Sequence, residues 1–128
     1  MTAVSQAVLV VEDDESLRLL MTVVLEGAGY RVVGVADGSS AIEAAQHHVG
    51  SIDMLLTDLQ LPDMSGTEVA RTLKERHSAM HVVFVSGYGA PTASQAKALS
   101  PGFHWIQKPF MVQDLLRRVR EILASAPS

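Results

Sequence analysis

The feature that most constrains the fold is a regular alternation of short apolar runs with longer amphipathic segments. Five apolar runs are too short for helices and are typical of strands, and the first of them is continuous and β-branched, as in a strand buried on both faces. They span residues 7–11, 30–35, 52–57, 81–85 and 103–107. After each run, apolar residues recur at helical spacing, which predicts helices over 17–25, 39–48, 67–76, 92–99 and 112–124. This alternation favours a parallel sheet with right-handed crossovers and helices on both faces.

The length of 128 residues selects among the parallel architectures. A closed barrel of alternating strands and helices needs about 250 residues, so an open doubly wound α/β sheet is favoured. We therefore predict a (βα)5 fold with five parallel strands in the flavodoxin-like order 2-1-3-4-5. We expect one domain over residues 1–128, with its core in about 7–124 and no output domain.

Composition and charge exclude several classes of function. Hydrophobic residues make up 48% of the chain and charged residues 19%, which indicates a folded globular protein. A net charge of −4 without a basic block argues against binding to nucleic acid or to an anionic membrane. No apolar run is long enough for a membrane span, and the first residues do not resemble a signal peptide. The absence of cysteine excludes disulfides and thiol chemistry and fits the cytoplasm, where we expect the protein to act.

Chemically reactive side chains gather where the predicted strands end. Glu12 and Asp13 follow the first run, Asp58 the third, Ser86 the fourth and Lys108 the fifth. Because function gathers at the carboxyl ends of the strands in open α/β sheets, we expect these residues to share one rim. The five histidines, by contrast, show no convincing metal-binding spacing and are expected at the surface.

This set of residue types suits phosphoryl transfer. Three carboxylates held close together resist ionisation, and a hard cation such as Mg²⁺ relieves their repulsion through oxygen ligands. A carboxylate can itself be the nucleophile that forms an aspartyl phosphate. A lysine and a serine across the site could then bind the phosphoryl oxygens. The set is therefore complete for Mg²⁺-assisted phosphorylation of an aspartate.

Four segments make the chain resemble the receiver domain of two-component response regulators, the CheY-like family. They are Val10–Asp14, Leu56–Asp58 with Leu61-Pro62 and Gly66, Val85–Gly87, and Lys108–Phe110. The resemblance covers residues 7–124, essentially the whole chain. Two segments, 86–88 and 106–110, are also similar to receivers of hybrid histidine kinases, so a receiver that belongs to a larger kinase is an alternative to an independent regulator.

The resemblance implies a phosphoacceptor and a metal site. Asp58 would accept a phosphoryl group from a phosphohistidine on a sensor histidine kinase or a histidine phosphotransfer protein. Asp13 would bind Mg²⁺ directly, and Glu12 would act largely through water. Asp58 itself and the main-chain carbonyl of Gln60 would complete the protein ligands.

The resemblance also implies a switch that partner proteins read. Lys108, expected to precede a cis peptide bond, would hold a phosphoryl oxygen, and Ser86 would move toward the phosphate. The family often has Tyr or Phe three residues before the lysine, where this chain has the bulkier Trp105. The sequence leaves open whether Trp105 takes part in the switch or only packs. The switch surface would comprise the predicted helix over 92–99, the last strand and the last helix, and a homodimer is left open.

Two other functions are alternatives to that of a phosphoacceptor. A receiver-like module could bind partners without phosphorylation, although the complete acidic set argues against it. A small phosphohydrolase could use Asp58 as a turnover nucleophile, but Gln60 cannot act as a general acid and no cap segment encloses a substrate. No glycine-rich nucleotide-binding motif occurs. We therefore expect a protein that assists its own phosphoryl transfer and hydrolysis rather than a turnover enzyme.

Overall fold

The computed structural model describes residues 5–87 and 103–125. Five parallel strands form one sheet in the order β2-β1-β3-β4-β5, as predicted. The strands are β1 (Ala7–Val11), β2 (Arg31–Val35), β3 (Met54–Asp58), β4 (His81–Ser86) and β5 (His104–Gln107). The predicted helix over 92–99 lies outside the described residues.

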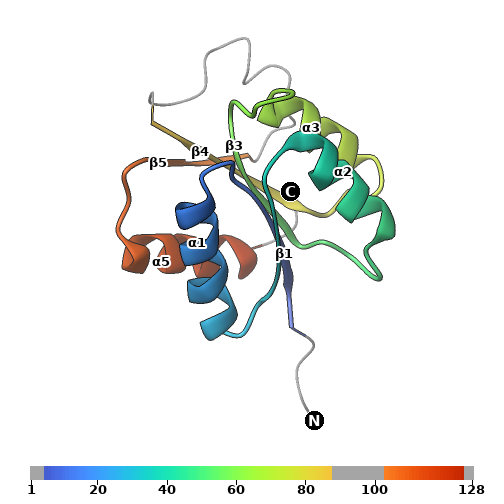
Figure 1. Cartoon of the computed structure of the whole chain (residues 1–128). Helices are drawn as coiled ribbons and strands as arrows, with labels where there is room; N and C mark the ends of the chain where they lie inside the picture. Colours follow the sequence, from blue (N-terminus) through green and yellow to red (C-terminus); the bar gives the residue numbers. More distant parts are fainter. Residues whose placement is uncertain (1–4, 88–102, 126–128) are drawn as a thin grey trace.

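The helices of the described residues cover both faces of this sheet (Figure 1). Two of them, α1 (Glu15–Gly27) and α5 (Val112–Leu123), lie together on one face. The other two, α2 (Gly38–His47) and α3 (Gly66–Lys74), lie on the opposite face. None of the helices within the described ranges is long and apolar enough to cross a membrane.

Alternation along the strands creates two apolar layers, because successive side chains of a strand point to opposite faces. In β1, Val8 and Val10 belong to the layer that faces α1 and α5, whereas Leu9 belongs to the layer that faces α2 and α3. The inner strands β1, β3 and β4 are buried along their whole length. The edge strands β2 and β5 are only partly buried.

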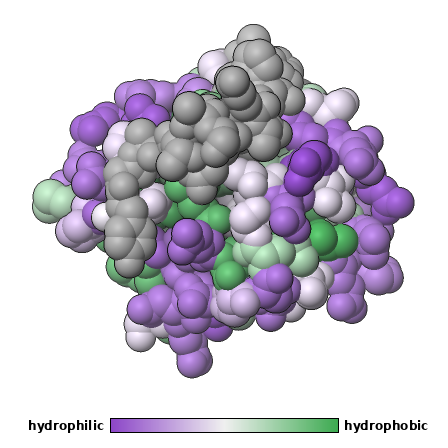
Figure 2. All heavy atoms as spheres, turned by 90° about the horizontal axis from the view of Figure 1, so that it is seen from above, coloured by the Kyte–Doolittle hydropathy of each residue, from purple (hydrophilic) through white to green (hydrophobic). Residues whose placement is uncertain are grey.

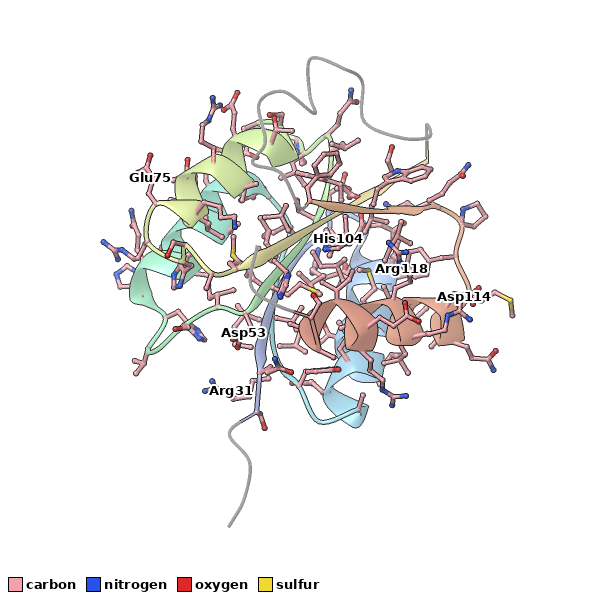
Figure 3. The ribbon with its side chains drawn as sticks, turned by 180° about the vertical axis from the view of Figure 1, so that it is seen from behind. Arg31, Asp53, Glu75, His104, Asp114 and Arg118 are labelled. Atoms are coloured by element: carbon pink, nitrogen blue, oxygen red, sulfur yellow. The ribbon has the colours of Figure 1, made fainter. Side chains whose placement is uncertain are left out.

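The last helix is tied to the edge strand on which it packs. Arg118 of α5 donates a hydrogen bond from Nη2 to the main-chain carbonyl of Trp105 in β5, over 3.4 Å. Arg118 and His104 of β5 lie near one another in the view from behind (Figure 3). The position of α5 relative to the end of β5 is thus supported by a polar contact as well as by apolar packing.

Candidate functional site

Three of the predicted site residues converge because they continue one face of the sheet. Glu12, Asp58 and Lys108 each lie two positions after a strand residue that belongs to the apolar layer facing α1 and α5. Those strand residues are Val10, Leu56 and Ile106. Parallel strands end at the same edge, so this alternation brings two carboxylates and an ammonium group together there.

Lys108 forms ion pairs with both Glu12 and Asp58. Lys108 Nζ lies 2.7 Å from Glu12 Oε1 and 2.8 Å from Asp58 Oδ1. The side chain of Glu12 is 2% exposed and that of Asp58 is 9% exposed, so water screens these charges little. The Lys108 amide donates to the carbonyl of Ser86 over 2.8 Å, and the Lys108–Pro109 bond is cis, as predicted.

The environment shifts the pKa values of all three groups. Burial, together with the neighbouring Glu12, raises the pKa of Asp58 from 3.8 to about 7, and Lys108 offsets only part of this effect. Burial alone would raise the pKa of Glu12, but its hydrogen bonds with Asp58 and Lys108 outweigh burial and lower it. Burial likewise opposes the charge of Lys108, yet its two carboxylate partners raise its pKa overall. The lysine is therefore charged, Glu12 is ionised, and Asp58 is the acid of this pair that titrates near neutral pH.

Asp13 completes an acidic cluster at the surface of this site. One carboxylate oxygen from each of Glu12, Asp13 and Asp58 lies within 4.8 Å of the others. Asp13 is exposed, so the cluster is open to solvent on its side. Hard oxygen donors with one open side suit Mg²⁺, which binds through one or two carboxylates and keeps several waters. The residues present therefore fit the ion that the sequence predicts.

Gln60 lies in the loop after β3, two residues after Asp58. The Gly66 amide donates to the carbonyl of Leu59 over 2.7 Å, and Gln60 pairs with Ser65 in an antiparallel bridge. A side chain at Gly66 would collide with the main-chain carbonyl oxygen of Asp58. The loop thus needs glycine at this position to turn back against the end of β3.

The same loop contains a residue whose importance could not be inferred from the sequence. Asp63 accepts hydrogen bonds from the amides of Gly38 and Ser39 at the start of α2, over 2.8 and 2.9 Å. Local sequence around Asp63 indicates only a turn, because its partners lie far away in the chain. No signal in the sequence alone could have identified this contact.

Ser86 and Trp105 continue the strand face opposite to that of Ile106, the residue two positions before Lys108. Trp105 pairs in register with Phe84, and Ser86 pairs with Gln107, so Ser86 and Trp105 face the α2 and α3 layer. Ser86 is buried at the end of β4. Trp105 packs against the apolar layer that contains Phe84, while its indole Nε1 has no acceptor within the described residues. The packing role of Trp105 is thus observed, and its switch role stays a prediction.

An open surface pocket lies beside Lys108. It has a volume of about 650 Å³ and is lined by Leu17, Gly87, Lys108, Pro109 and Phe110. Seen from above, the molecule has a mainly hydrophilic rim around a smaller apolar area (Figure 2). Lys108 is the residue that this pocket shares with the ion pair, and the three acids are not among its lining residues.

Comparison with known proteins identifies similar chains. Residues 8–120 match the response regulator receiver domain family. The chain is 32% identical over 119 residues to the response regulator receiver protein CpdR of Brucella abortus (strain 2308). This match covers 93% of this chain and 98% of CpdR. It is 31% identical over 119 residues to the sensor kinase CckA of the same organism. That match covers 93% of this chain but only 13% of CckA.

The fold matches solved structures as well. A crystal structure of a response regulator receiver protein from Sinorhizobium medicae WSM419 has a TM-score of 0.83 to this structure at 29% identity. The match covers 94% of this chain and 96% of the other. Relatives thus include both a receiver protein of similar length and a much longer kinase.

Proposed function

Because the chain belongs to the response regulator receiver domain family, we propose that Asp58 is the phosphoacceptor through which it acts in two-component signalling. The donor is a phosphohistidine on a sensor histidine kinase or on a histidine phosphotransfer protein. The observation that carries this proposal is the buried Asp58 carboxylate, paired with Lys108 beside two further acids. Cytoplasmic protein partners, rather than nucleic acid, fit the net charge of −4.

The chain's own residues account for the transfer step. The ionised Asp58 attacks phosphorus, and an O–P bond forms as the N–P bond of the donor imidazole breaks. The imidazole nitrogen keeps the electron pair of the broken bond. Lys108, which already contacts Asp58 Oδ1, binds a phosphoryl oxygen as charge spreads over the transferring group. Ser86, at the neighbouring strand end, donates its hydroxyl to another of these oxygens.

Asp13, Glu12, Asp58 and the carbonyl of Gln60 would hold Mg²⁺. The bound ion would neutralise charge on the three carboxylates and on the phosphoryl oxygens. Without such neutralisation, a negatively charged donor group would approach a cluster of carboxylates that repels it. We therefore propose that transfer depends on Mg²⁺.

Phosphorylation would then be read by partner proteins as a change in conformation. Lys108 and Ser86 both change partners when the phosphoryl group arrives, and the Lys108 amide is bonded to the Ser86 carbonyl. A shift of Ser86 would reach Trp105, which faces the same layer of the sheet. We propose that β5, which holds Trp105, and α5 form part of the switch surface.

Incubation with acetyl phosphate and Mg²⁺, followed by intact mass measurement, tests the proposal. We expect a gain of one phosphoryl group that requires the metal and is lost in Asp58→Asn, a substitution of similar volume. Circular dichroism of this variant serves as the control for folding. No gain in mass would favour a module that binds partners without phosphorylation. Rapid and continuing consumption of acetyl phosphate would favour a phosphohydrolase.

A further inference from the structure

The loop between β3 and α3 is a small hairpin whose tip is anchored elsewhere. The Gly66 amide donates to the Leu59 carbonyl over 2.7 Å, and the Leu61 amide donates to the Met64 carbonyl over 3.0 Å. Gln60 lies between these two bonds in one arm, opposite Ser65. The base of the hairpin is fixed at Gly66, so the course of the arm depends on what holds the tip.

Asp63, at that tip, is bonded to the first residues of α2. Its Oδ1 accepts from the Gly38 amide over 2.8 Å. Its Oδ2 accepts from the Ser39 amide over 2.9 Å and from the Ser39 hydroxyl over 2.7 Å. The Ser39 hydroxyl, followed by the two amides, lowers the pKa of Asp63 to about 2, so the carboxylate is ionised at any physiological pH. The neighbouring Met64 packs so closely on Gly38 that a methyl group at Gly38 would displace it.

Helix α2 does not need Asp63 as a cap. The helix has its own N-cap, Asp37, whose side chain accepts from the Ser40 amide over 2.8 Å. Two carboxylates thus bind the same helix end, one from the preceding residue and one from a distant loop. This division indicates that the Asp63 contact serves the loop more than the helix.

We propose that Asp63 is a positioning residue that sets the direction of the Gln60 carbonyl toward the metal. The inference rests on the proposed Mg²⁺ site with Gln60 as a ligand. A hairpin held at its base by Gly66 and at its tip by Asp63 leaves the intervening arm little freedom. When the tip is released, the carbonyl loses its fixed orientation, and ordering it again costs part of the metal-binding free energy.

Metal affinity in paired variants tests the inference without relying on phosphorylation. Mg²⁺ binding is measured by NMR titration of Asp63→Ala, of Asp37→Ala and of the wild type. We expect Asp63→Ala to raise the dissociation constant about tenfold, as the loss of a contact that orients a metal ligand does. Asp37→Ala removes a carboxylate from the same helix end but not from the loop, so its constant should stay near the wild-type value. At saturating Mg²⁺, both variants should be phosphorylated by acetyl phosphate.

A milder variant covers the case in which Asp63→Ala does not fold. Ser39→Ala removes one of the donors to Asp63 and should raise the dissociation constant about threefold. Unchanged affinity in both Asp63→Ala and Ser39→Ala, or an equal loss in Asp63→Ala and Asp37→Ala, would overturn the positioning role. A wild-type protein that does not bind Mg²⁺ would instead overturn the proposed metal site.

Discussion

The ammonium group of Lys108 lies 2.8 Å from Oδ1 of Asp58, so the proposed nucleophile is paired with the cation that would later bind the phosphoryl group. The same ammonium contacts Glu12 at 2.7 Å, and both acids are almost completely buried. Lys108 offsets the repulsion between the acids, and in the proposed function it would also bind the incoming oxygens. Stability and phosphorylation of Lys108 variants measure these two effects separately.

We expect Lys108→Met to reduce both stability and phosphorylation. The variant leaves two buried carboxylates without their cation, which should lower the free energy of unfolding by about 1–3 kcal/mol, less than for a fully enclosed pair. Loss of the oxygen-binding group should slow phosphorylation about 10²–10³-fold. Urea unfolding and intact mass against time measure the two effects.

Arg117→Met is the matched control for Lys108→Met. Arg117 also contacts two acids, Asp114 and Glu121, but these ion pairs lie on the exposed surface of α5. Such pairs contribute about 0–1 kcal/mol, so this variant should be nearly as stable as the wild type. If the two variants lose equal stability, the buried ion pair does not have the importance assigned to it.

Stability without metal should fall as pH rises from about 4 to about 7. The pKa of Asp58 is 3.8 in the unfolded chain and about 7 in the folded protein, so the folded state binds the extra proton between these values. Stability decreases with pH wherever the folded state binds more protons than the unfolded state, and the loss here is at most about 4 kcal/mol. Urea unfolding in the presence of a chelator at pH 5 and pH 8 measures the part of this loss that lies above pH 5, at most about 3 kcal/mol.

Asp58→Asn identifies the group responsible for the pH effect. The amide cannot release a proton, so most of the loss of stability between pH 5 and pH 8 should disappear in this variant. A loss as large as that of the wild type would show that another group titrates in this range.

Gly66→Ala should destabilise the protein and disturb the metal site together. The added methyl group would collide with the Asp58 carbonyl oxygen, which belongs to the main chain and cannot swing away. We expect the free energy of unfolding to fall by about 3 kcal/mol, as overpacking at a rigid position does. Gly27→Ala is the control, because an added methyl group there contacts nothing within 4 Å. At the end of α1 it should be neutral or stabilising by up to about 1 kcal/mol. Equal stability of the two variants in urea would contradict the close contact at Gly66.

The strand order and the convergence at the sheet edge could be predicted from the sequence because both follow from short-range patterns. Continuous apolar runs identify buried strands, and parallel strands must end at one edge. Boundaries were less accurate, since they depend on individual side chains. The first helix begins at Glu15 rather than at Leu17, because the Asp14 side chain caps it by accepting from the Leu17 amide.

Contacts between distant segments could not be predicted. The histidines were expected at the surface, but His77 and His81 are buried. The Nδ1 atom of His77 accepts a hydrogen bond from the amide of Ile52 over 3.2 Å. Ile52 lies outside β3, which begins at Met54 rather than at residue 52. The bonds from Asp63 to α2 are of the same kind. Nothing in the residues around His77 or Asp63 indicates which backbone amide each will meet.

Asp13 provides the most selective test of metal binding, because its side chain has no hydrogen bond or ion pair within the described residues. Asp13→Asn should therefore leave the metal-free protein within about 0.5 kcal/mol of the wild type, or slightly more stable, as acidic repulsion falls. Mg²⁺ at ten times its dissociation constant should stabilise the wild type by about 1.4 kcal/mol, because it binds only the folded state. The same concentration should stabilise Asp13→Asn far less. Exposed Asp14, adjacent in the chain but bonded through its side chain to Leu17, offers a control: Asp14→Asn should keep the full stabilisation by Mg²⁺. Equal stabilisation of all three proteins in thermal unfolding would exclude Asp13 as a metal ligand.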